Sequence, residues 1–232
     1  MHMLPLSWKL LIFDLDGLLV NTEMMHFRAY KAACQGLGGK MDWTFDTYFQ
    51  VAGSSSTGLQ ERLSRENPYI FRSLSWEEFY EKKQQSLFEL LRTEPIPLMP
   101  GVKEFLESAR DLECRMACVT HSRKLFVDTI RMQHPFFSCI HSWYTRESYD
   151  RAKPFPDGYI KAVEEEGVLP DQAIGFEDSL RGIQAQIEAG IHPVLVTKDE
   201  QTKKTAKDFP SVLIVESLYE VHDVLFGKNQ DT

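Results

Sequence analysis

After residue 100 the sequence alternates between short apolar runs and amphipathic stretches, and this alternation limits the fold more than any other feature. The amphipathic stretches have helical spacing, and two of them stop at Gly167 and Gly190. Strands that alternate with helices predict an α/β fold with a parallel, doubly wound sheet. The expected strands are Leu10–Phe13, Arg115–Thr120, Cys139–Tyr144, Ala173–Phe176, Pro193–Thr197 and Val212–Val215.

A long helical insertion separates the first expected strand from the others. Residues 23–92 read as almost wholly helical, with one Gly/Ser break at residues 53–58 and a capping-box pattern at Ser75 and Glu78. Prolines at positions 95, 97 and 100 then mark a linker. We therefore expect a sheet-containing core formed by residues 1–21 and 98–232, with an inserted helical cap domain over residues 22–97.

The charge balance narrows the classes of partner. Lys and Arg number 26 and Asp and Glu number 34, which gives a formal net charge of −8. An acidic chain disfavours nucleic acid and anionic lipid as partners, and no apolar run reaches the roughly 18 residues of a membrane span. We expect a monomer that binds neither nucleic acid nor membrane. If its substrate is an anion, the site must contain its own cation.

The four cysteines, Cys34, Cys114, Cys118 and Cys139, include no C-x-x-C pair. This spacing favours buried free thiols in a reducing compartment over a metal site or a disulfide framework. We therefore expect a cytoplasmic protein.

Two aspartates follow the first expected strand directly. In open α/β sheets, ligands bind beyond the carboxyl ends of the strands. Asp14 and Asp16 are two residues apart, so in an extended chain they point the same way, and Gly17 permits a sharp turn after them. Carboxylates this close repel each other unless a cation or a shared proton compensates. The alternative is a pair of loop or helix-cap residues in solvent.

Three more strand ends or loops carry polar residues. Thr120 ends the second strand, Lys153 precedes a helix, and Glu177 and Asp178 follow the fourth strand. Taken alone, each has an ordinary interpretation as a helix cap, a solvated lysine or an acidic helix N-terminus. Together they form an oxygen-rich cluster that suits Mg²⁺. A divalent cation and Lys153 would balance the acids and leave room for a dianionic phosphate.

The order of these motifs resembles that of the haloacid dehalogenase (HAD) superfamily. The helical insertion is similar to the cap of its β-phosphoglucomutase-like branch. The motifs that carry the resemblance are Asp14-x-Asp16-Gly17, Thr120, Lys153-Pro154-x-Pro156-Asp157, Glu177-Asp178-Ser179, Asn21-Thr22-Glu23 and the stretch from His26 to Lys31.

The resemblance implies a catalytic role for four residues. Asp14 would be the nucleophile that attacks phosphorus and becomes an aspartyl-phosphate. Asp16 would protonate the leaving alcohol and then deprotonate the attacking water. Thr120 and Lys153 would hold the phosphoryl oxygens.

The resemblance also implies a set of metal ligands. Mg²⁺ would be bound by the Asp14 carboxylate, the Asp16 backbone carbonyl and Asp178. Glu177 would support the metal directly or through water.

Further residues are expected around the substrate. In relatives, a histidine at the position of His26 aligns the acid/base aspartate, but an ordinary place on the first cap helix remains open. For His121, contact with substrate and exposure to solvent both remain open, and the Gly/Ser loop could be a simple helix connector. The expected substrate-binding residues are Thr120, His121, Ser122, Lys153, His26, Ser54, Ser55 and Ser56.

The implied activity is that of a Mg²⁺-dependent phosphatase acting on a small phosphorylated metabolite, a sugar or polyol phosphate. Asp16 disfavours a dehalogenase, because halide leaves without a proton. β-Phosphoglucomutases place an arginine in the cap loop where this chain has Ser56, which favours hydrolysis, although Arg62, Lys82 or Lys83 could substitute. The alternative is a sugar-phosphate mutase. A phosphorylatable receiver-type switch is a third hypothesis, against which the insertion and Asp16 argue.

Overall fold

The computed structural model describes residues 8–54, 57–111, 114–209 and 211–226. It divides into two units, which are described separately. The core unit comprises the chain up to Asn21 and from Pro97 onward, and the helical unit comprises Thr22–Ile96. The expected domain boundaries remain a proposal: residues 1–21 and 98–232 form the core domain, and residues 22–97 form the cap domain.

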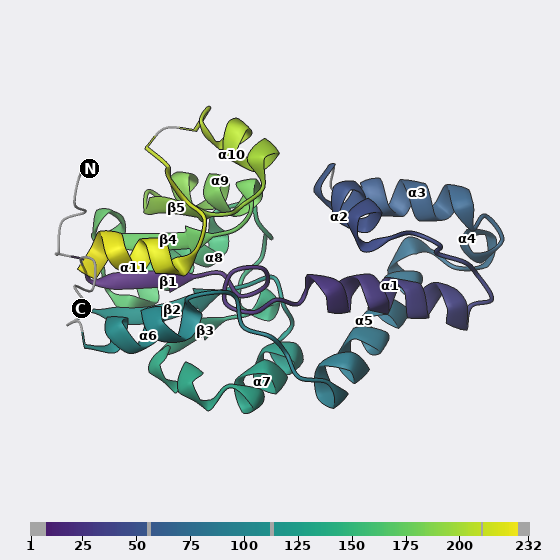
Figure 1. Ribbon diagram of the computed structural model, residues 1–232, viewed down its shortest axis with the longest axis horizontal. Helices are drawn as coiled ribbons and strands as arrows, with labels where there is room; N and C mark the ends of the chain where they lie inside the picture. Colours follow the sequence, from purple (N-terminus) through teal and green to yellow (C-terminus); the bar gives the residue numbers. More distant parts are fainter. Residues whose placement is uncertain (1–7, 55–56, 112–113, 210, 227–232) are drawn as a thin grey trace, which may run out of the picture. The chain divides into compact units, whose positions relative to one another are not determined.

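The core unit is built on a six-stranded parallel sheet with the order β3-β2-β1-β4-β5-β6 (Figure 1). The register pairs Phe13 with Cys118 on one side and with Phe176 on the other, so three strands end at the same edge. This confirms the expected doubly wound sheet. The strands are β1 (Leu10–Phe13), β2 (Arg115–Val119), β3 (Ser142–Tyr144), β4 (Ala173–Glu177), β5 (His192–Val196) and β6 (Leu213–Val215).

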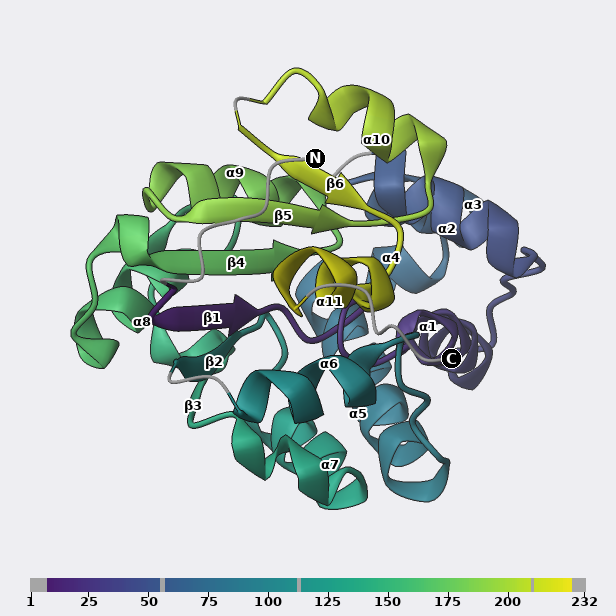
Figure 2. The same cartoon turned by 60° about the vertical axis from the view of Figure 1, so that its left-hand side comes forward.

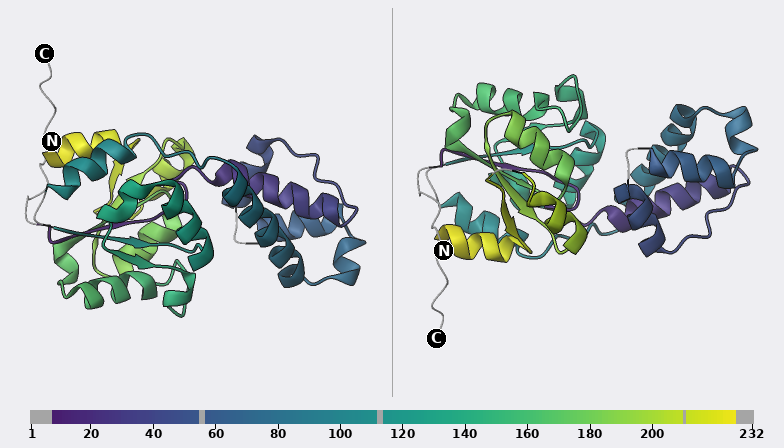
Figure 3. Two further views of the ribbon diagram at one scale, coloured as in Figure 1. Left: turned by 90° about the horizontal axis from the view of Figure 1, so that it is seen from below. Right: turned by 90° about the horizontal axis from the view of Figure 1, so that it is seen from above.

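Helices cover both faces of this sheet. The helices α6 and α11 pack against each other over one face, as Figures 2 and 3 show from several sides. The helices α8 and α9 pack against strands β2, β4 and β5. Connections between parallel strands are right-handed, and this explains why the two halves of the sheet place their helices on opposite faces. The helices are α6 (Val102–Arg110), α7 (Lys124–Gln133), α8 (Asp157–Glu166), α9 (Leu180–Glu188), α10 (Glu200–Ala206) and α11 (Leu218–Phe226), with short 3₁₀ helices η1 (Pro135–Cys139), η2 (Arg146–Ser148) and η3 (Pro170–Gln172).

Strand β1 lies at the centre of the core. All four of its residues are fully buried, because helices cover both faces of a parallel sheet and its strands therefore need continuous apolar runs. Phe13 stacks on Phe176 with ring centroids 5.2 Å apart, and Phe105 of α6 meets both rings edge-on. This packing fixes the strand whose end carries Asp14.

Within its described residues, 22–54 and 57–96, the helical unit contains five helices, of which α1 and α5 lie side by side (Figure 1). The expected capping box is confirmed, since Ser75 and Glu78 bond reciprocally at the start of α5. The apolar core of the unit is rich in aromatic rings, including Phe79, Tyr30 and Tyr48. The helices are α1 (Glu23–Gly36), α2 (Phe45–Ser54), α3 (Gly58–Glu66), α4 (Ile70–Ser73) and α5 (Trp76–Thr93).

Two sequence expectations about local structure were wrong. The chain leaves the helical state after Gly36, and residues 37–44 are not helical; Gly38 has a φ of +77°, which favours glycine. The expected strand Cys139–Tyr144 is shortened to Ser142–Tyr144, because Pro135–Cys139 form the 3₁₀ helix η1. The helices α10 and α11 were not expected.

The four cysteines are free thiols. Cys34 and Cys118 are buried as expected, whereas Cys114 and Cys139 are only half-buried. Among the helices in the described ranges, none has both the length and the apolar character needed to cross a bilayer.

Candidate active site

Asp14 and Asp16 lie at the carboxyl end of β1. The backbone N–H of Asp14 donates to the carbonyl of Phe176 over 3.0 Å, which extends the strand pairing by one residue, and the Asp14 side chain is buried. Gly17 has a φ of +84°, and a Cβ at this position would lie 2.0 Å from Oδ2 of Asp178. Glycine is therefore required at position 17 both for the turn and for the close approach of Asp178.

Lys153 reaches this strand end from the loop before α8. Its Nζ donates to Oδ1 of Asp14 and to Oε1 of Glu177, each over 2.5 Å, and to the carbonyl of Val119 over 2.8 Å. These three bonds use all three protons of the ammonium group. The side chain is buried, so the structure places one desolvated cation between two acidic strand ends.

Glu177 is anchored from two helices. The hydroxyl of Tyr159 donates to its Oε1 over 2.6 Å, and the hydroxyl of Ser179 donates to its Oε2 over 3.1 Å. Gln186 in turn donates to the Tyr159 hydroxyl over 3.3 Å. Gly182 leaves space for this carboxylate, because a Cβ there would lie 1.8 Å from its carboxyl carbon. The position of Glu177 is therefore set by α8 and α9.

Three carboxylates could hold a metal ion together. Asp14, Glu177 and Asp178 each offer an oxygen, and these oxygens lie within 4.8 Å of one another. Hard oxygen donors of this kind suit Mg²⁺, so the residues present fit the expected metal. The Asp16 carboxylate does not belong to this group. If Asp16 binds the metal, it would do so through its backbone carbonyl.

The Asp16 carboxylate instead faces the end of β2. Its Oδ2 accepts from the hydroxyl of Ser122 over 2.6 Å and from the hydroxyl of Thr120 over 3.4 Å. Thr120 is held in turn, because its backbone N–H donates to the carbonyl of Tyr144 and its hydroxyl accepts the N–H of Ser122. The carboxylate is half-buried, which suits a group that exchanges protons with a ligand.

The charges of the site are unbalanced. Burial raises the pKa of Asp14 to about 8; Lys153 opposes this shift, while Glu177 and Asp16 add to it. Burial alone would lower the pKa of the Lys153 ammonium, but Asp14 and Glu177 outweigh it and hold that pKa well above its usual value. One lysine faces several acids, and a divalent cation would supply the missing positive charge.

His121 contacts the same loop as Lys153. Its Nε2 accepts the backbone N–H of Lys153 over 2.6 Å. Burial, together with the positive charges of Lys153 and Arg181, lowers the pKa of its imidazole to about 3, so the ring is neutral near pH 7. The two possibilities left open from sequence, contact with substrate or exposure to solvent, did not include this contact.

The remaining expected site residues belong to the helical unit. His26 lies on α1, where its Nδ1 is 2.8 Å from Nζ of Lys83, a fully buried lysine on α5. Ser54 ends α2, and Ser55 and Ser56 lie outside the described residues. The core unit thus brings together Asp14, Asp16, Thr120, His121, Ser122, Lys153, Glu177 and Asp178, and their roles remain proposals.

Sequence reasoning missed Tyr159 and Gln186 as parts of the site. A fully buried tyrosine needs a partner for its hydroxyl, and that requirement was the available signal. No such indication for Gln186 was present in the sequence, because only the fold shows that it donates to the Tyr159 hydroxyl.

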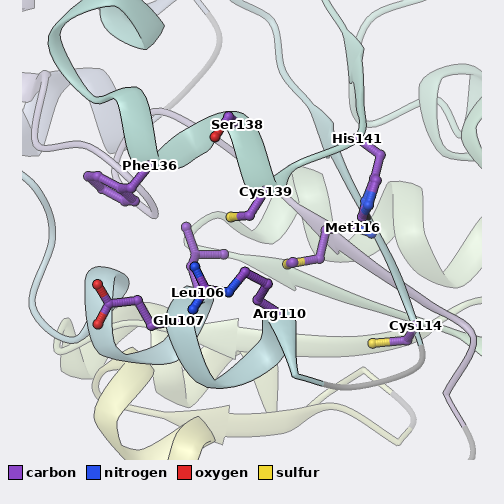
Figure 4. Close-up of a pocket in the computed structure, with 9 residues that line it drawn as sticks. All are labelled: Leu106, Glu107, Arg110, Cys114, Met116, Phe136, Ser138, Cys139 and His141. Carbon is purple, nitrogen blue, oxygen red and sulfur yellow. Dashed lines mark hydrogen bonds between the residues drawn. The ribbon is translucent and has the colours of Figure 1, made fainter.

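A separate cavity of about 440 Å³ lies elsewhere in the core unit, beside α6, η1 and the amino ends of β2 and β3 (Figure 4). None of the expected site residues lines it. The carboxylates described above lie at the opposite, carboxyl ends of the strands. The lining residues are Leu106, Glu107, Arg110, Cys114, Met116, Phe136, Ser138, Cys139 and His141.

Comparisons with known proteins agree on one family. Residues 11–196 match the model of the haloacid dehalogenase-like hydrolases. The chain is 27% identical to protein CbbY of Rhodobacter capsulatus over 84% of this chain and 87% of that protein. It is 28% identical to a phosphorylated carbohydrates phosphatase of Thermotoga maritima over 79% of this chain and 82% of that protein. A predicted phosphoglycolate phosphatase of Haemophilus somnus shares the fold, with a TM-score of 0.78 at 22% identity over 94% of this chain and 98% of that chain.

Proposed function

The chain belongs to the haloacid dehalogenase-like hydrolase family, in its β-phosphoglucomutase-like branch, and is a phosphatase; from that premise we propose that it hydrolyses a small phosphorylated metabolite through an aspartyl-phosphate, with Mg²⁺ bound. One observation carries the proposal. The buried Asp14 accepts a hydrogen bond from Lys153, and one of its carboxylate oxygens lies within 4.8 Å of carboxylate oxygens of Glu177 and Asp178. This combination suits a carboxylate that must approach an anionic phosphate.

In the first step, a carboxylate oxygen of Asp14 forms a bond to phosphorus as the bond from phosphorus to the ester oxygen breaks. Asp16 donates its proton to the departing alkoxide, which leaves as an alcohol. Lys153 and Thr120 would each hold a phosphoryl oxygen by giving up one of the hydrogen bonds described above, and the ammonium offsets the repulsion between the phosphoryl oxygens and Asp14. Asp14, Asp178 and the Asp16 carbonyl would hold Mg²⁺, with support from Glu177; the metal, when bound, supplies further positive charge for the phosphoryl group.

In the second step, Asp16 acts as a base. It takes a proton from water while the water oxygen forms a bond to phosphorus and the bond to Asp14 breaks. The products are inorganic phosphate and a restored Asp14 carboxylate. The hydroxyl of Ser122, which donates to Oδ2 over 2.6 Å, orients the Asp16 carboxylate for both proton transfers.

The name of the Thermotoga maritima relative supports a phosphorylated carbohydrate or polyol as the substrate class. In the core unit, His121 and Ser122 border the phosphoryl site and are proposed to complete it. In the helical unit, we propose substrate contacts for His26, Ser54, Ser55 and Ser56. We further propose that the enzyme works in the cytoplasm as a monomer, without a nucleic-acid or membrane partner.

The test is release of inorganic phosphate from a panel of sugar and polyol phosphates, with and without EDTA. We expect metal-dependent release, its abolition in Asp14→Asn, and no change in the matched variant Asp171→Asn, whose exposed side chain lies on η3. Full activity in EDTA or in Asp14→Asn would reject the mechanism. Turnover of β-glucose 1-phosphate without net phosphate release would favour the alternative, a β-phosphoglucomutase-type isomerase.

A further inference from the structure

We propose that His121 is a positioning residue: its neutral imidazole holds the backbone of Lys153 and thereby sets the place from which the ammonium meets Asp14 and the phosphoryl group. The inference rests on the proposed function for the role of Lys153. It assigns Nε2 of His121 to the backbone of Lys153, a role that neither of the two possibilities left open from the sequence included.

The contact itself fixes the tautomer of His121. The backbone N–H of Lys153 donates to Nε2 over 2.6 Å, and a ring nitrogen that accepts a hydrogen bond carries no proton. The single proton of the neutral ring is therefore on Nδ1. With Nε2 committed to the lysine backbone, that nitrogen is not a donor to a phosphoryl oxygen.

The surroundings keep the ring neutral. The imidazole is half-buried, and this burial together with the positive charges of Lys153, Arg181 and Arg146 disfavours a second proton more than the charge of Asp16 favours one. Protonation of Nε2 would turn an acceptor into a donor that faces another donor.

Lys153 is thus held at both of its ends. His121 holds the backbone N–H, while Asp14, Glu177 and the carbonyl of Val119 hold the ammonium. The next residue, Pro154, has no backbone N–H to offer a substitute bond.

A second bond joins the same two loops. The hydroxyl of Tyr149 donates to the carbonyl of Thr120 over 2.8 Å, and the rings of Tyr149 and His121 lie 6.4 Å apart. The loop after β2, which carries the phosphoryl-binding hydroxyl, is therefore tied to the loop that carries the lysine. Loss of the His121 bond would leave this tie and free the segment nearest Lys153.

Two substitutions separate positioning from other roles. In His121→Gln the side-chain carbonyl can reach the place of Nε2 and accept the same N–H. In His121→Asn the shorter amide stays near the place of Nδ1 and cannot. A residue that touches substrate through Nδ1 would show the reverse order, with Asn the better replacement.

The experiment measures kcat/KM with p-nitrophenyl phosphate and the affinity for inorganic phosphate by calorimetry in Mg²⁺, together with Tm. We expect His121→Asn to lower kcat/KM and phosphate affinity about tenfold, the effect of ~1.4 kcal/mol of lost interaction. His121→Gln should stay within about threefold of the unmodified protein, because a replaced hydrogen bond restores most of that energy. Equal losses in Gln and Asn, or no loss in Asn, would overturn the proposal.

Nuclear magnetic resonance of the unmodified protein gives a readout that needs neither turnover nor a folded variant. We expect a scalar coupling across the hydrogen bond between the Lys153 amide nitrogen and His121 Nε2, and a proton on Nδ1. A proton on Nε2 would reject the contact. If the protein proved inactive but His121→Asn still bound phosphate more weakly than His121→Gln, the proposed function would be rejected and this inference would stand.

Discussion

Nζ of Lys153 lies 2.5 Å from Oδ1 of Asp14, although the two residues are separated by 139 positions in the sequence. Both side chains are buried, so the attraction between them is weakly screened by water. The same ammonium also serves Glu177. The lysine therefore faces two buried acidic groups at once and opposes the rise in the pKa of Asp14 that burial causes, and this is the arrangement from which the proposed chemistry follows.

The first prediction concerns the removal of this cation. Lys153→Met leaves Asp14 and Glu177 buried without their partner, and breaking a buried ion pair on one side costs ~3–5 kcal/mol. We expect a loss of unfolding free energy of that order in metal-free protein and a loss of phosphatase activity. Urea denaturation measures the first effect.

The matched control for this variant is Lys161→Met on α8. Lys161 pairs with Glu165 over 2.7 Å, but both side chains are exposed, so water screens the attraction and the pair adds little to stability. Similar destabilisation by the two substitutions would show that the buried pair has no special energetic role.

The second prediction links metal affinity to pH. Burial raises the pKa of metal-free Asp14 to about 8, so below pH 8 its carboxyl holds a proton that a bound metal must displace. The apparent Mg²⁺ affinity should therefore rise as pH increases from about 6 to 8, by up to ~tenfold per pH unit, and level off above. Calorimetry in buffers of different ionisation enthalpy counts the released proton.

Asp14→Asn is the control for the metal experiment. It removes the titrating group, and we expect weaker binding with little dependence on pH. An affinity that is flat between pH 6 and 8 in the unmodified protein would contradict the assignment of Asp14 as a protonated ligand site.

The third prediction concerns the space around Glu177. In Gly182→Ala the new methyl group would overlap the Glu177 carboxylate, which several donors hold in place. We expect kcat/KM to fall by at least ~tenfold, the effect of ~1.4 kcal/mol, together with a lower Tm. Gly36→Ala is the control, because nothing lies within 4 Å of its new Cβ. Unchanged kinetics in Gly182→Ala would show that the position of Glu177 does not matter.

The sequence predicted the strand ends of the site well, and physical reasons explain this. Asp14 and Gly17 follow a run of apolar residues that only a buried strand accommodates, and parallel strands end at a common edge. The contact between Lys153 and His121 could not be predicted, because it joins two loops whose paths depend on the whole fold. For Tyr159 the need of a buried hydroxyl for a partner was foreseeable, but only the fold shows that this partner is Glu177.

The helical insertion was predicted less well. Residues 23–92 were expected to be helical except for one break, but α1 ends at Gly36 and Gly38 has a φ of +77°, which a helix does not allow. The short helix η1 was not expected, and only its last residue, Cys139, fell within the expected strand, because five residues are too few for a helical period to show.

The most direct test of the central claim is a rapid-quench experiment on Asp16→Asn with p-nitrophenyl phosphate. Nitrophenolate leaves without a proton, so this variant should still form the aspartyl-phosphate but hydrolyse it slowly for want of a base. We predict a burst of one nitrophenolate per site, with the phosphoryl group recovered on Asp14. Linear release without a burst, or a phosphoryl group on any other residue, would contradict the account.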